Sequence, residues 1–380
     1  MYLLEHDAKE VLTACGILVP AGCLVASERE LDGTALPPGP WMAKGQIAAG
    51  GRGKAGIIRK AATVAELHAQ ISAITGSTVN GRRVEAVRIE QQISGADEAY
   101  VSLMLDAAAG GVRVIVSERG GVDVEALAPD AIHSAVAAPD IEATARCVSQ
   151  LTGAIPERLG APLRDAALRL ARVFYEREAL LVEINPLFIR PDGSWVAGDA
   201  KLVTDDNALE RQPALRELLA RRAAAYPEAV LKLGHGFDYV VVDPEGEIGL
   251  LTTGAGLSMM LIDELRAAGL KPYNFLDIRT GGLRGEITRL VSVLEWIARG
   301  PRVRVLLINI FAGITELGEF SRLLVTALSK SPLRVPVVAR LVGNGLPVAR
   351  EVLSAAGIAL HTDLDEALAA LRRHLSDENN

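Results

Sequence analysis

The first half of the chain combines helical and strand patterns without a regular alternation between them. Apolar residues recur at helical spacing over 3–15 and 63–74, whereas 23–27 and 41–47 are short apolar runs typical of strands. A loop rich in glycine and basic residues follows the second of these strands. This mixture predicts an α+β domain.

Further along, the apolar runs over 84–93 and 98–107 are predicted to pair as a hairpin, and a strand over 112–118 extends the same sheet. Longer helical periodicity predicts helices over 162–178 and 214–227. The second of these helices closes the first half of the chain.

The pattern changes at Asp238 to apolar strands that alternate regularly with amphipathic helices. Nearly continuous apolar strands of this kind indicate a parallel sheet that helices cover on both faces. We therefore predict an α/β protein whose second half is doubly wound and flavodoxin-like, with domains at 1–230 and 231–380. The predicted strands of this half are 238–243, 248–253, 273–278, 303–311, 335–341 and 358–360.

One predicted hairpin carries an unusual set of polar side chains. Pairing around a turn at 191–193 places Asn185 opposite Asp199 and Glu183 opposite Lys201. Because side chains two positions apart share a face, all four polar groups lie on one side of the hairpin. The side chains expected on the other side are Val182, Ile184, Val196 and Gly198. A carboxylate and an amide oxygen suit Mg²⁺ that also keeps waters and phosphates, although an exposed face with a salt bridge has the same pattern.

The glycine-rich loop at 48–56 is a candidate phosphate site. Its backbone N–H groups and the charges of Arg52 and Lys54 favour an anion. It is not a Walker A loop, because no Ser or Thr follows the lysine, and a surface turn is the alternative. If a nucleotide binds here, Glu90 and Glu98 could accept hydrogen bonds from its ribose or base; otherwise they are solvated charges.

Three further glycine loops follow strands of the second half, beginning at Thr253, Arg279 and Ala312. The carboxyl ends of parallel strands meet at one edge of a sheet, where ligands bind. Each loop precedes a helix N-terminus, which attracts a carboxylate or phosphate, although tight turns need glycine in any case. Met259 replaces the third glycine of a dinucleotide fingerprint, which argues against NAD binding.

Composition narrows the class of function. A formal net charge of −7 and a pI of about 5.5 argue against a nucleic-acid surface. The 3 cysteines form no CxxC pair, which fits a reducing compartment, and the chain shows neither a signal peptide nor a membrane-length apolar segment. None of the 6 histidines stands in a metal-ligand spacing or beside a nucleophile motif. We expect a cytoplasmic protein without a membrane or nucleic-acid partner.

Several motifs together resemble the β subunit of succinate–CoA ligase (succinyl-CoA synthetase) and its malate–CoA ligase-type relatives. The most specific are GGRGKAG at 50–56, EINPL at 183–187 and GDAKL at 198–202. Supporting matches span the chain: the Ala-Lys pair at 8–9, SERGGVDVE at 117–125, ALERQP at 208–213, TGAGLSM at 253–259, NFLDI at 274–278, NIFAGI at 309–314 and PVVARLVGN at 336–344.

This resemblance implies an ATP-grasp domain followed by a CoA-ligase domain. The ATP site that it implies comprises Lys44, Gly51, Arg52, Gly53, Glu90 and Glu98. It implies Mg²⁺ bound by Asn185 and Asp199, and Glu183 as a catalytic residue facing a phosphohistidine. The implied contacts to the acid substrate are Thr253, Ala312, Gly313 and Ile314.

The reaction implied by the resemblance uses ATP, Mg²⁺ and CoA. ATP phosphorylates a histidine on a separate α subunit, the phosphate passes to a carboxylate, and CoA attacks the acyl phosphate. The implied partner is this α subunit, which also holds the CoA site, in an αβ, α2β2 or larger complex that serves the tricarboxylic acid cycle. The absence of a placed catalytic histidine here agrees with that arrangement. Pro20 stands where adenine-using members tend to carry proline, which favours ATP over GTP.

The departures from the family pattern lie mostly near the acid site. Thr253 replaces a usual asparagine, and Ala312 replaces a usual glycine. Residues 278–284 read IRTGGLR where the family has a run of glycines, and 342–345 read VGNG where it has EGNN. The added arginines and hydroxyl suggest a dicarboxylate or related acid other than succinate, such as malate.

Two alternatives stay open. Another ATP-grasp enzyme, such as a carboxylate–amine ligase, would lack the flavodoxin-like half. An inactive or regulatory paralogue could keep the fold and lose the reaction, although this chain retains Lys44, Glu183, Asn185 and Asp199.

Overall fold

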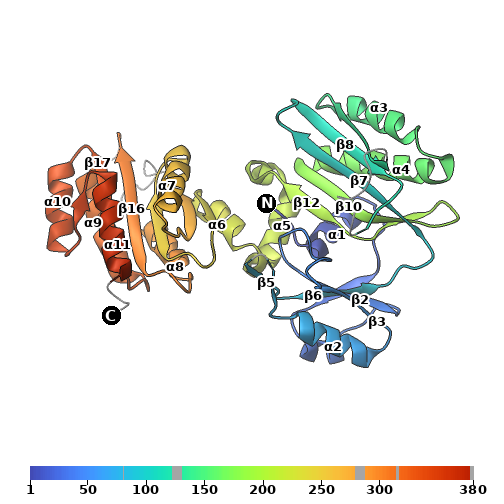
Figure 1. Cartoon of the computed structure of the whole chain (residues 1–380), viewed down its shortest axis with the longest axis horizontal. Helices are drawn as coiled ribbons and strands as arrows, with labels where there is room; N and C mark the ends of the chain where they lie inside the picture. Colours follow the sequence, from blue (N-terminus) through green and yellow to red (C-terminus); the bar gives the residue numbers. More distant parts are fainter. Residues whose placement is uncertain (80, 122–130, 279–286, 314–315, 377–380) are drawn as a thin grey trace. The chain divides into compact units, whose positions relative to one another are not determined.

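The computed structural model describes residues 1–79, 81–121, 131–278, 287–313 and 316–376. The chain forms two compact units, Met1–Leu218 and Leu219–Asn380 (Figure 1). The division lies within helix α5 (Pro213–Arg221), whereas the expected boundary at residues 230 and 231 lies within α6 (Pro227–His235).

A small antiparallel sheet forms one layer of the first unit. It contains β1 (Gly22–Val25), β2 (Trp41–Gly45), β3 (Ile58–Ala61) and β6 (Val87–Gln91), and helix α2 (Val64–Ile74) packs against it. The strand order is β1-β6-β2-β3. Leu67, Ile71 and Ile74 recur at helical spacing and join its buried core, so the periodicity of the sequence decides which face of α2 is buried.

A larger sheet forms the second layer of this unit. Its strands are β7 (Asp97–Asp106), β8 (Gly111–Ser117), β9 (His133–Ala137), β10 (Ala179–Ile189), β11 (Trp195–Ala197) and β12 (Lys201–Thr204). The order is β11-β10-β7-β8-β9, with β12 also paired to β10. Helices α3 (Ile141–Thr152) and α4 (Glu157–Glu176) cover it (Figure 1). Leu163 and Leu170 of α4 and Val101 of β7 are fully buried.

The predicted hairpin of 84–93 with 98–107 is wrong, although both strands exist. β6 pairs with β1 and β2 in the small sheet, whereas β7 pairs with β8 and β10 in the large one. Ile89 belongs to the core of the small sheet. The alternation of apolar residues identifies a strand but not its partner, so the connecting segment passes between layers instead of turning back. The continuation of β7 by the strand at 112–118 is confirmed as β8.

The register predicted for the polar hairpin is confirmed. Glu183 lies opposite Lys201 in the β10–β12 ladder, and Leu187 lies opposite Ala197 in the β10–β11 ladder. Both pairs continue the same register, which puts Asn185 opposite Asp199. The ladder is interrupted between β11 and β12, where Gly198 N donates to the Pro186 carbonyl at 2.9 Å. Val182 and Ile184 are buried on the opposite side, as expected. The placement of Val196 on that side is wrong: the register of β10 against β7 shifts between Ile184 and Leu187, so Val196, opposite Phe188, lies on the same side as Glu183.

Two helical predictions need adjustment, and one is confirmed. Helix α1 (Glu5–Ala14) agrees with the predicted segment 3–15, but α4 begins at Glu157, so the predicted start at Pro162 is wrong. Burial of Leu159 and Pro162 keeps the turn before the proline helical despite its weak propensity. The segment 214–227 divides into α5, a 3₁₀ turn η5 (Ala223–Ala225) and the unpredicted α6, since Pro227 begins a new helix.

The first unit also contains four short elements in its described part: η1 (Glu28–Gly33), β4 (Thr78–Val79), β5 (Arg82–Arg83) and η4 (Asp206–Arg211).

The second unit contains the predicted parallel sheet. Strands β14 (Ile248–Thr252), β16 (Val305–Ala312), β17 (Val337–Gly343) and β18 (Leu360–His361) pair in parallel in that order. Strand β15 (Asn274–Asp277) runs beside β14, because Tyr273 N donates to the Ile248 carbonyl at 2.8 Å and Ile278 N donates to the Thr252 carbonyl at 3.1 Å. The resulting order β15-β14-β16-β17-β18 is flavodoxin-like.

Helices cover both faces of this sheet (Figure 1). The core on one face includes α8 (Thr288–Ile297), α9 (Leu317–Lys330) and α10 (Leu346–Ala355), and the other includes α7 (Ala255–Ala267) and α11 (Leu364–Ser376).

The expectation that every strand is parallel is wrong at the edge. β13 (Asp238–Val241) pairs antiparallel with β15, because a short turn rather than a helix connects it to β14. In the described part of the chain, no helix has the length and apolar character needed to cross a membrane.

The central strand β16 is expected to control the stability of the second unit. Ile308 has no exposed surface, so Ile308→Ala should lower the free energy of unfolding by about 2–5 kcal/mol. Leu233→Ala, at a side chain that is 40% exposed, is the control and should change it far less. Urea unfolding of the two variants checks this, and equal losses would contradict the assigned core.

Candidate functional site

A cluster of buried ionic side chains joins helix α1 to both layers of the first unit. The charge cluster comprises Glu5 and Lys9 of α1, Lys44 of β2, Arg52 of the glycine-rich loop, Arg88 and Glu90 of β6, and Asp199 of the hairpin. Burial of so many charges is costly unless each is paired. The cluster is therefore a candidate functional site.

Glu5 is the central anion of the charge cluster. Its carboxylate lies 2.7 Å from Lys9 Nζ, 2.9 Å from Lys44 Nζ and 2.6 Å from Arg52 Nη1, and its side chain has no exposed surface. Burial alone would raise the pKa of Glu5, but Arg52, Lys44 and Lys9 together hold it well below the ordinary value of 4.5. Glu5 therefore remains ionised and fixes three cations.

Glu90 is the second shared carboxylate. It lies 2.6 Å from both Lys9 and Lys44 and 2.8 Å from Arg88. Burial opposes its ionised form, but Lys44 and Lys9 lower the pKa of Glu90. Burial likewise opposes the charged form of Lys44, and the carboxylates of Glu5 and Glu90 outweigh it and raise the Lys44 pKa. Lys44 thus stays positively charged.

The carbonyl of Gly198 connects the charge cluster to the polar hairpin. It accepts hydrogen bonds from Lys44 Nζ at 2.7 Å and from Lys9 Nζ at 2.9 Å. A Cβ at Gly198 would lie 2.3 Å from the ring of Phe188, so only glycine fits here without displacing the ring. The interruption of the hairpin ladder therefore presents a backbone acceptor to two lysines.

Asp199 meets the glycine-rich loop. Arg52 Nη2 lies 2.6 Å from Asp199 Oδ1, and the N–H of Ala200 donates to the same oxygen at 2.7 Å. Among the described residues, no hydrogen bond or ion pair engages Oδ2 of Asp199, whose side chain is 25% exposed. A carboxylate that already holds a guanidinium, with one oxygen open, fits a cation site, and Asn185 opposite it adds an amide oxygen.

Asn185 and Glu183 complete the polar face of the hairpin. Asn185 Oδ1 accepts from Gly121 N at 2.6 Å, and its Nδ2 donates to the Gly121 carbonyl at 3.0 Å. The Tyr100 hydroxyl donates to Glu183 Oε2 at 3.1 Å. Glu183 forms no ion pair with Lys201, although both residues are among those described. The alternative interpretation of this face, an exposed surface with a salt bridge, is therefore wrong for the pair Glu183 and Lys201.

The other predicted nucleotide residues divide between the two layers. Glu90 belongs to the charge cluster, whereas the exposed Glu98 lies on β7, opposite Phe188 of the hairpin strand. Its Oε2 lies beside Gly121, where a Cβ would be 2.8 Å away. Gly51 and Gly53 flank Arg52 in an exposed loop, and Gly51 has a φ of 78° that favours glycine.

The predicted acid-site residues lie at the carboxyl edge of the second unit's sheet. Thr253 follows β14 and Ala312 ends β16, both largely buried, and Gly313 is exposed. Asn344 Nδ2 donates to the Gly313 carbonyl at 3.4 Å, which brings the loop after β17 to the same edge. Ile314 and the segment 279–284 lie outside the described residues.

Comparison with known proteins now decides the family. Residues 2–189 match the family model of the ATP-grasp domain, and residues 251–373 match that of the CoA-ligase domain. The chain is 34% identical over 376 residues to the β subunit of ADP-forming succinate–CoA ligase from Desulfurococcus amylolyticus, with 97% of each chain covered. The chain belongs to the succinate–CoA ligase β-subunit family. This confirms the family and the ATP-grasp and CoA-ligase folds that the motifs predicted.

Other comparisons agree with this family. The β subunit of the GDP-forming succinate–CoA ligase from Thermus thermophilus is 35% identical over 378 residues, with 98% of each chain covered. The structure of ATP citrate lyase from Methanothrix soehngenii in complex with citrate and coenzyme A superimposes with a TM-score of 0.67 over 95% of each chain. Its identity is only 18%, so this likeness shows the shared fold alone.

Sequence reasoning missed three members of the charge cluster: Glu5, Lys9 and Arg88. Glu5 and Lys9 are four positions apart on α1, which is usually the pattern of an exposed ion pair. The sequence did contain one signal. Glu5 directly follows Leu4, and Lys9 directly follows Ala8. Both apolar residues are buried together with Leu12, so the polar pair lies beside the packed face of α1. The succinate–CoA ligase resemblance pointed to Lys9 without giving it a role.

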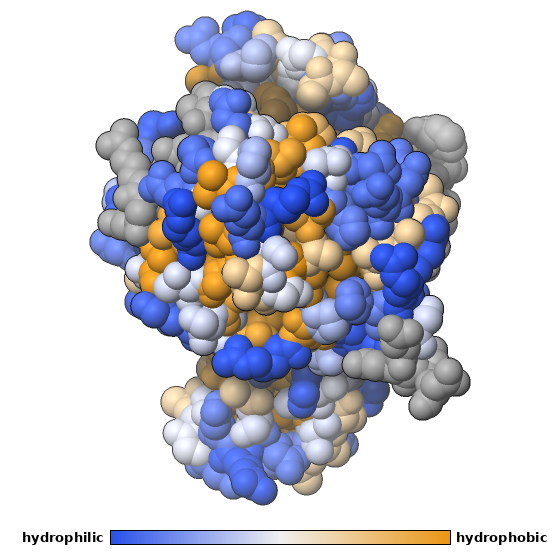
Figure 2. Space-filling view, turned by 90° about the vertical axis from the view of Figure 1, so that its left-hand side faces the viewer, coloured by the Kyte–Doolittle hydropathy of each residue, from blue (hydrophilic) through white to orange (hydrophobic). Residues whose placement is uncertain are grey.

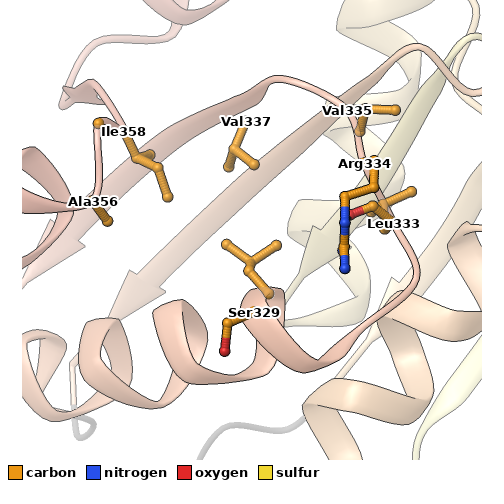
Figure 3. Close-up of a pocket in the computed structure, with 9 residues that line it drawn as sticks. Ser329, Leu333, Arg334, Val335, Val337, Ala356 and Ile358 are labelled. Atoms are coloured by element: carbon orange, nitrogen blue, oxygen red, sulfur yellow. The ribbon is translucent and has the colours of Figure 1, made fainter.

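The apolar surface of the second unit does not belong to this site. A cavity of about 630 Å³ opens at the amino end of β17, opposite the edge that carries Ala312 (Figure 3). Figure 2 views the molecule from the side on which α9, α10 and α11 lie in Figure 1 and shows apolar atoms gathered between polar side chains. The cavity is lined by Leu328, Ser329, Leu333, Arg334, Val335, Val337, Ala356, Gly357 and Ile358.

Replacement of the central anion should destabilise the first unit. Glu5→Gln leaves Lys9, Lys44 and Arg52 without their shared counter-charge and should cost about 3–5 kcal/mol of unfolding free energy. Glu142→Gln is the matched control, because Glu142 also faces a cation four positions away on a helix, at 3.9 Å, but at the surface. Equal urea midpoints for the two variants would contradict the central role of Glu5.

The charge cluster also predicts how stability depends on pH. The folded pKa values of Glu5 and Glu90 are lowered, so the unfolded chain binds protons more readily than the folded one. Their contribution is present above the ordinary value of 4.5 and is lost as the pH falls through the lowered folded values. Unfolding free energies measured from pH 7 to pH 3 should therefore fall on acidification, and less steeply in Glu90→Gln. A flat profile would contradict this.

Proposed function

We propose that this chain is the nucleotide-binding β subunit of an ADP-forming acid–CoA ligase, with the nucleotide domain at 1–230 and the CoA-ligase domain at 231–380. The observation that carries the proposal is the meeting of Lys44, Arg52 and Asp199 in one buried cluster next to Glu183. Phosphoryl transfer needs this combination of positioned cations and carboxylates, since catalysis there is mainly positioning and charge stabilisation.

The terminal phosphates of ATP would bind near Lys44 and Arg52. The charge cluster holds four cations, Lys9, Lys44, Arg52 and Arg88, against the three carboxylates of Glu5, Glu90 and Asp199. The excess positive charge suits an anion. Gly51 and Gly53 would supply backbone N–H groups, Glu90 fixes Lys44, and Glu98 accepts from the rest of the nucleotide. Arg88 donates to the Pro20 carbonyl at 2.9 Å, which ties the residue that favours ATP to this cluster.

Mg²⁺ would be held by Asn185 and Asp199, whose amide and carboxylate oxygens suit it. When bound, the ion neutralises charge on the phosphates during transfer. Arg52 pairs with Oδ1 of Asp199, so Oδ2 is the oxygen that would be left to bind the ion. Glu183, oriented by Tyr100, would face the histidine that receives the phosphoryl group.

The proposed reaction has three steps. The terminal phosphoryl group of ATP passes to a ring nitrogen of a histidine on a partner α subunit, and ADP leaves. A carboxylate oxygen of the acid then takes the phosphoryl group, which restores the histidine and forms an acyl phosphate. The CoA thiolate attacks the acyl carbon and releases inorganic phosphate, so that a thioester results. The partner carries the histidine and the CoA site, in an αβ, α2β2 or larger complex in the cytoplasm.

The acid would bind at the edge that carries Thr253, Ala312, Gly313 and Ile314. Thr253 places a hydroxyl where the family usually has an amide, and Ala312 adds a methyl group where it usually has glycine. These changes support a dicarboxylate such as malate beside or in place of succinate, because a hydroxyl can exchange hydrogen bonds with a substrate hydroxyl.

The complex purified from its own cells should label its partner chain when incubated with γ-labelled ATP and Mg²⁺. The label should be acid-labile and should be discharged by CoA together with one acid from a panel that includes succinate and malate. A partner that co-purifies and never carries phosphate would favour an inactive paralogue. If succinate were turned over far faster than every other acid, the proposed change in acid specificity would be wrong, but the proposed ligase activity would stand.

Asp199→Asn should lower the rate of partner labelling by about 100-fold, because it removes the charged ligand proposed for Mg²⁺. Asp192→Asn is the control on the same hairpin, since this carboxylate lies in the exposed turn, where it accepts from Ser194 N at 2.9 Å. Single-turnover labelling measures both rates. Equal rates in the two variants would contradict the proposed metal site.

A further inference from the structure

Tyr2 extends the polar face of the hairpin. It forms an antiparallel bridge with Val203, and Leu3 N donates to the Leu202 carbonyl at 2.9 Å, so the first residues lie along β12. Residues directly opposite each other share a face, as do residues two positions apart. Tyr2 is therefore on the same face as Val203, Lys201 and Glu183.

The contacts of Tyr2 place its ring within this polar face. Lys201 Nζ lies 5.9 Å from the ring centroid, so the ring lies next to the Lys201 ammonium. Burial, followed by the charges of Asp199, Glu183 and Glu5, raises the pKa of Tyr2 to about 12 despite the opposing effect of Arg52. The phenol is thus protonated and neutral at physiological pH.

The hydroxyl of Tyr2 has no acceptor within the part of the chain that the structure describes. Tyr100, the other tyrosine at this face, donates to Glu183 at 3.1 Å. Glu183 and Asp199 are carboxylates and offer only acceptors when ionised. Tyr2 is therefore a neutral hydrogen-bond donor without an acceptor among the described residues, on a face otherwise rich in acceptors. Its hydroxyl can donate a hydrogen bond to an acceptor on a bound molecule.

We propose that the Tyr2 hydroxyl donates a hydrogen bond to the phosphoryl group while that group is transferred at Glu183. This rests on the proposed phosphoryl transfer to the partner's histidine. Tyr2 keeps its proton throughout and forms no covalent bond. A neutral donor stabilises the charge on the phosphoryl oxygens without adding a cation that would pair with Glu183 or Asp199 instead.

Tyr2→Phe tests this role, because it removes the hydroxyl and keeps the ring against Lys201. With the variant introduced in its own cells and the complex purified intact, the single-turnover rate of partner labelling at saturating MgATP should fall about tenfold or more. The dissociation constant of MgATP should change by less than about threefold. The urea midpoint should stay at the wild-type value, since none of the described residues forms a hydrogen bond with this hydroxyl.

Tyr175→Phe is the control for loss of a tyrosine hydroxyl. Tyr175 lies on α4, and its hydroxyl pairs with Thr144 at 2.9 Å, so this variant should label the partner at the wild-type rate. A Tyr2→Phe labelling rate within twofold of wild type would overturn the inference. So would an unchanged rate at saturation with a weakened MgATP affinity, because that pattern places Tyr2 on the bound nucleotide alone. Failure of the wild-type complex to label its partner would instead reject the proposed function.

Discussion

The first unit depends on one buried carboxylate. Glu5 is the common partner of Lys9, Lys44 and Arg52, which come from a helix, a strand and a loop. Three cations so close together repel one another, and removal from water adds to the cost. The shared anion offsets both effects and leaves the cations charged and immobile. A phosphate-binding site needs that state, so under the proposed function the ion pairs that hold the layers together would also prepare the unit for a nucleotide.

Much of this arrangement could be predicted from the sequence. The hairpin register follows from the turn at 191–193 and the period of two along each strand, and it put Glu183 opposite Lys201. The alternation of strands and helices after Asp238 gave the parallel sheet and its ligand edge. Specific motifs gave the family. These features are local in sequence, or depend on a pattern that one kind of fold satisfies.

The rest depends on contacts between distant segments, which periodicity does not encode. The runs that became β6 and β7 have the same apolar pattern, but they belong to different sheets. Glu5 and Lys9 have the spacing of a surface ion pair, and only the packing of α1 between layers buries them. The ladder interruption at Gly198 turns a carbonyl toward two lysines, a role that no side-chain pattern reveals. The charges were visible in the sequence, while their convergence was not.

Equilibrium binding of MgATP to the wild-type complex and to Lys44→Met tests the central claim most directly. The claim is that the charge cluster is a nucleotide site and not merely a buried ion network. We expect the wild type to bind MgATP and the variant to lose at least about tenfold in affinity, because hydrogen bonds to a charged group contribute this much. Equal affinities, or no binding by the wild type, would show that the cluster serves the fold alone.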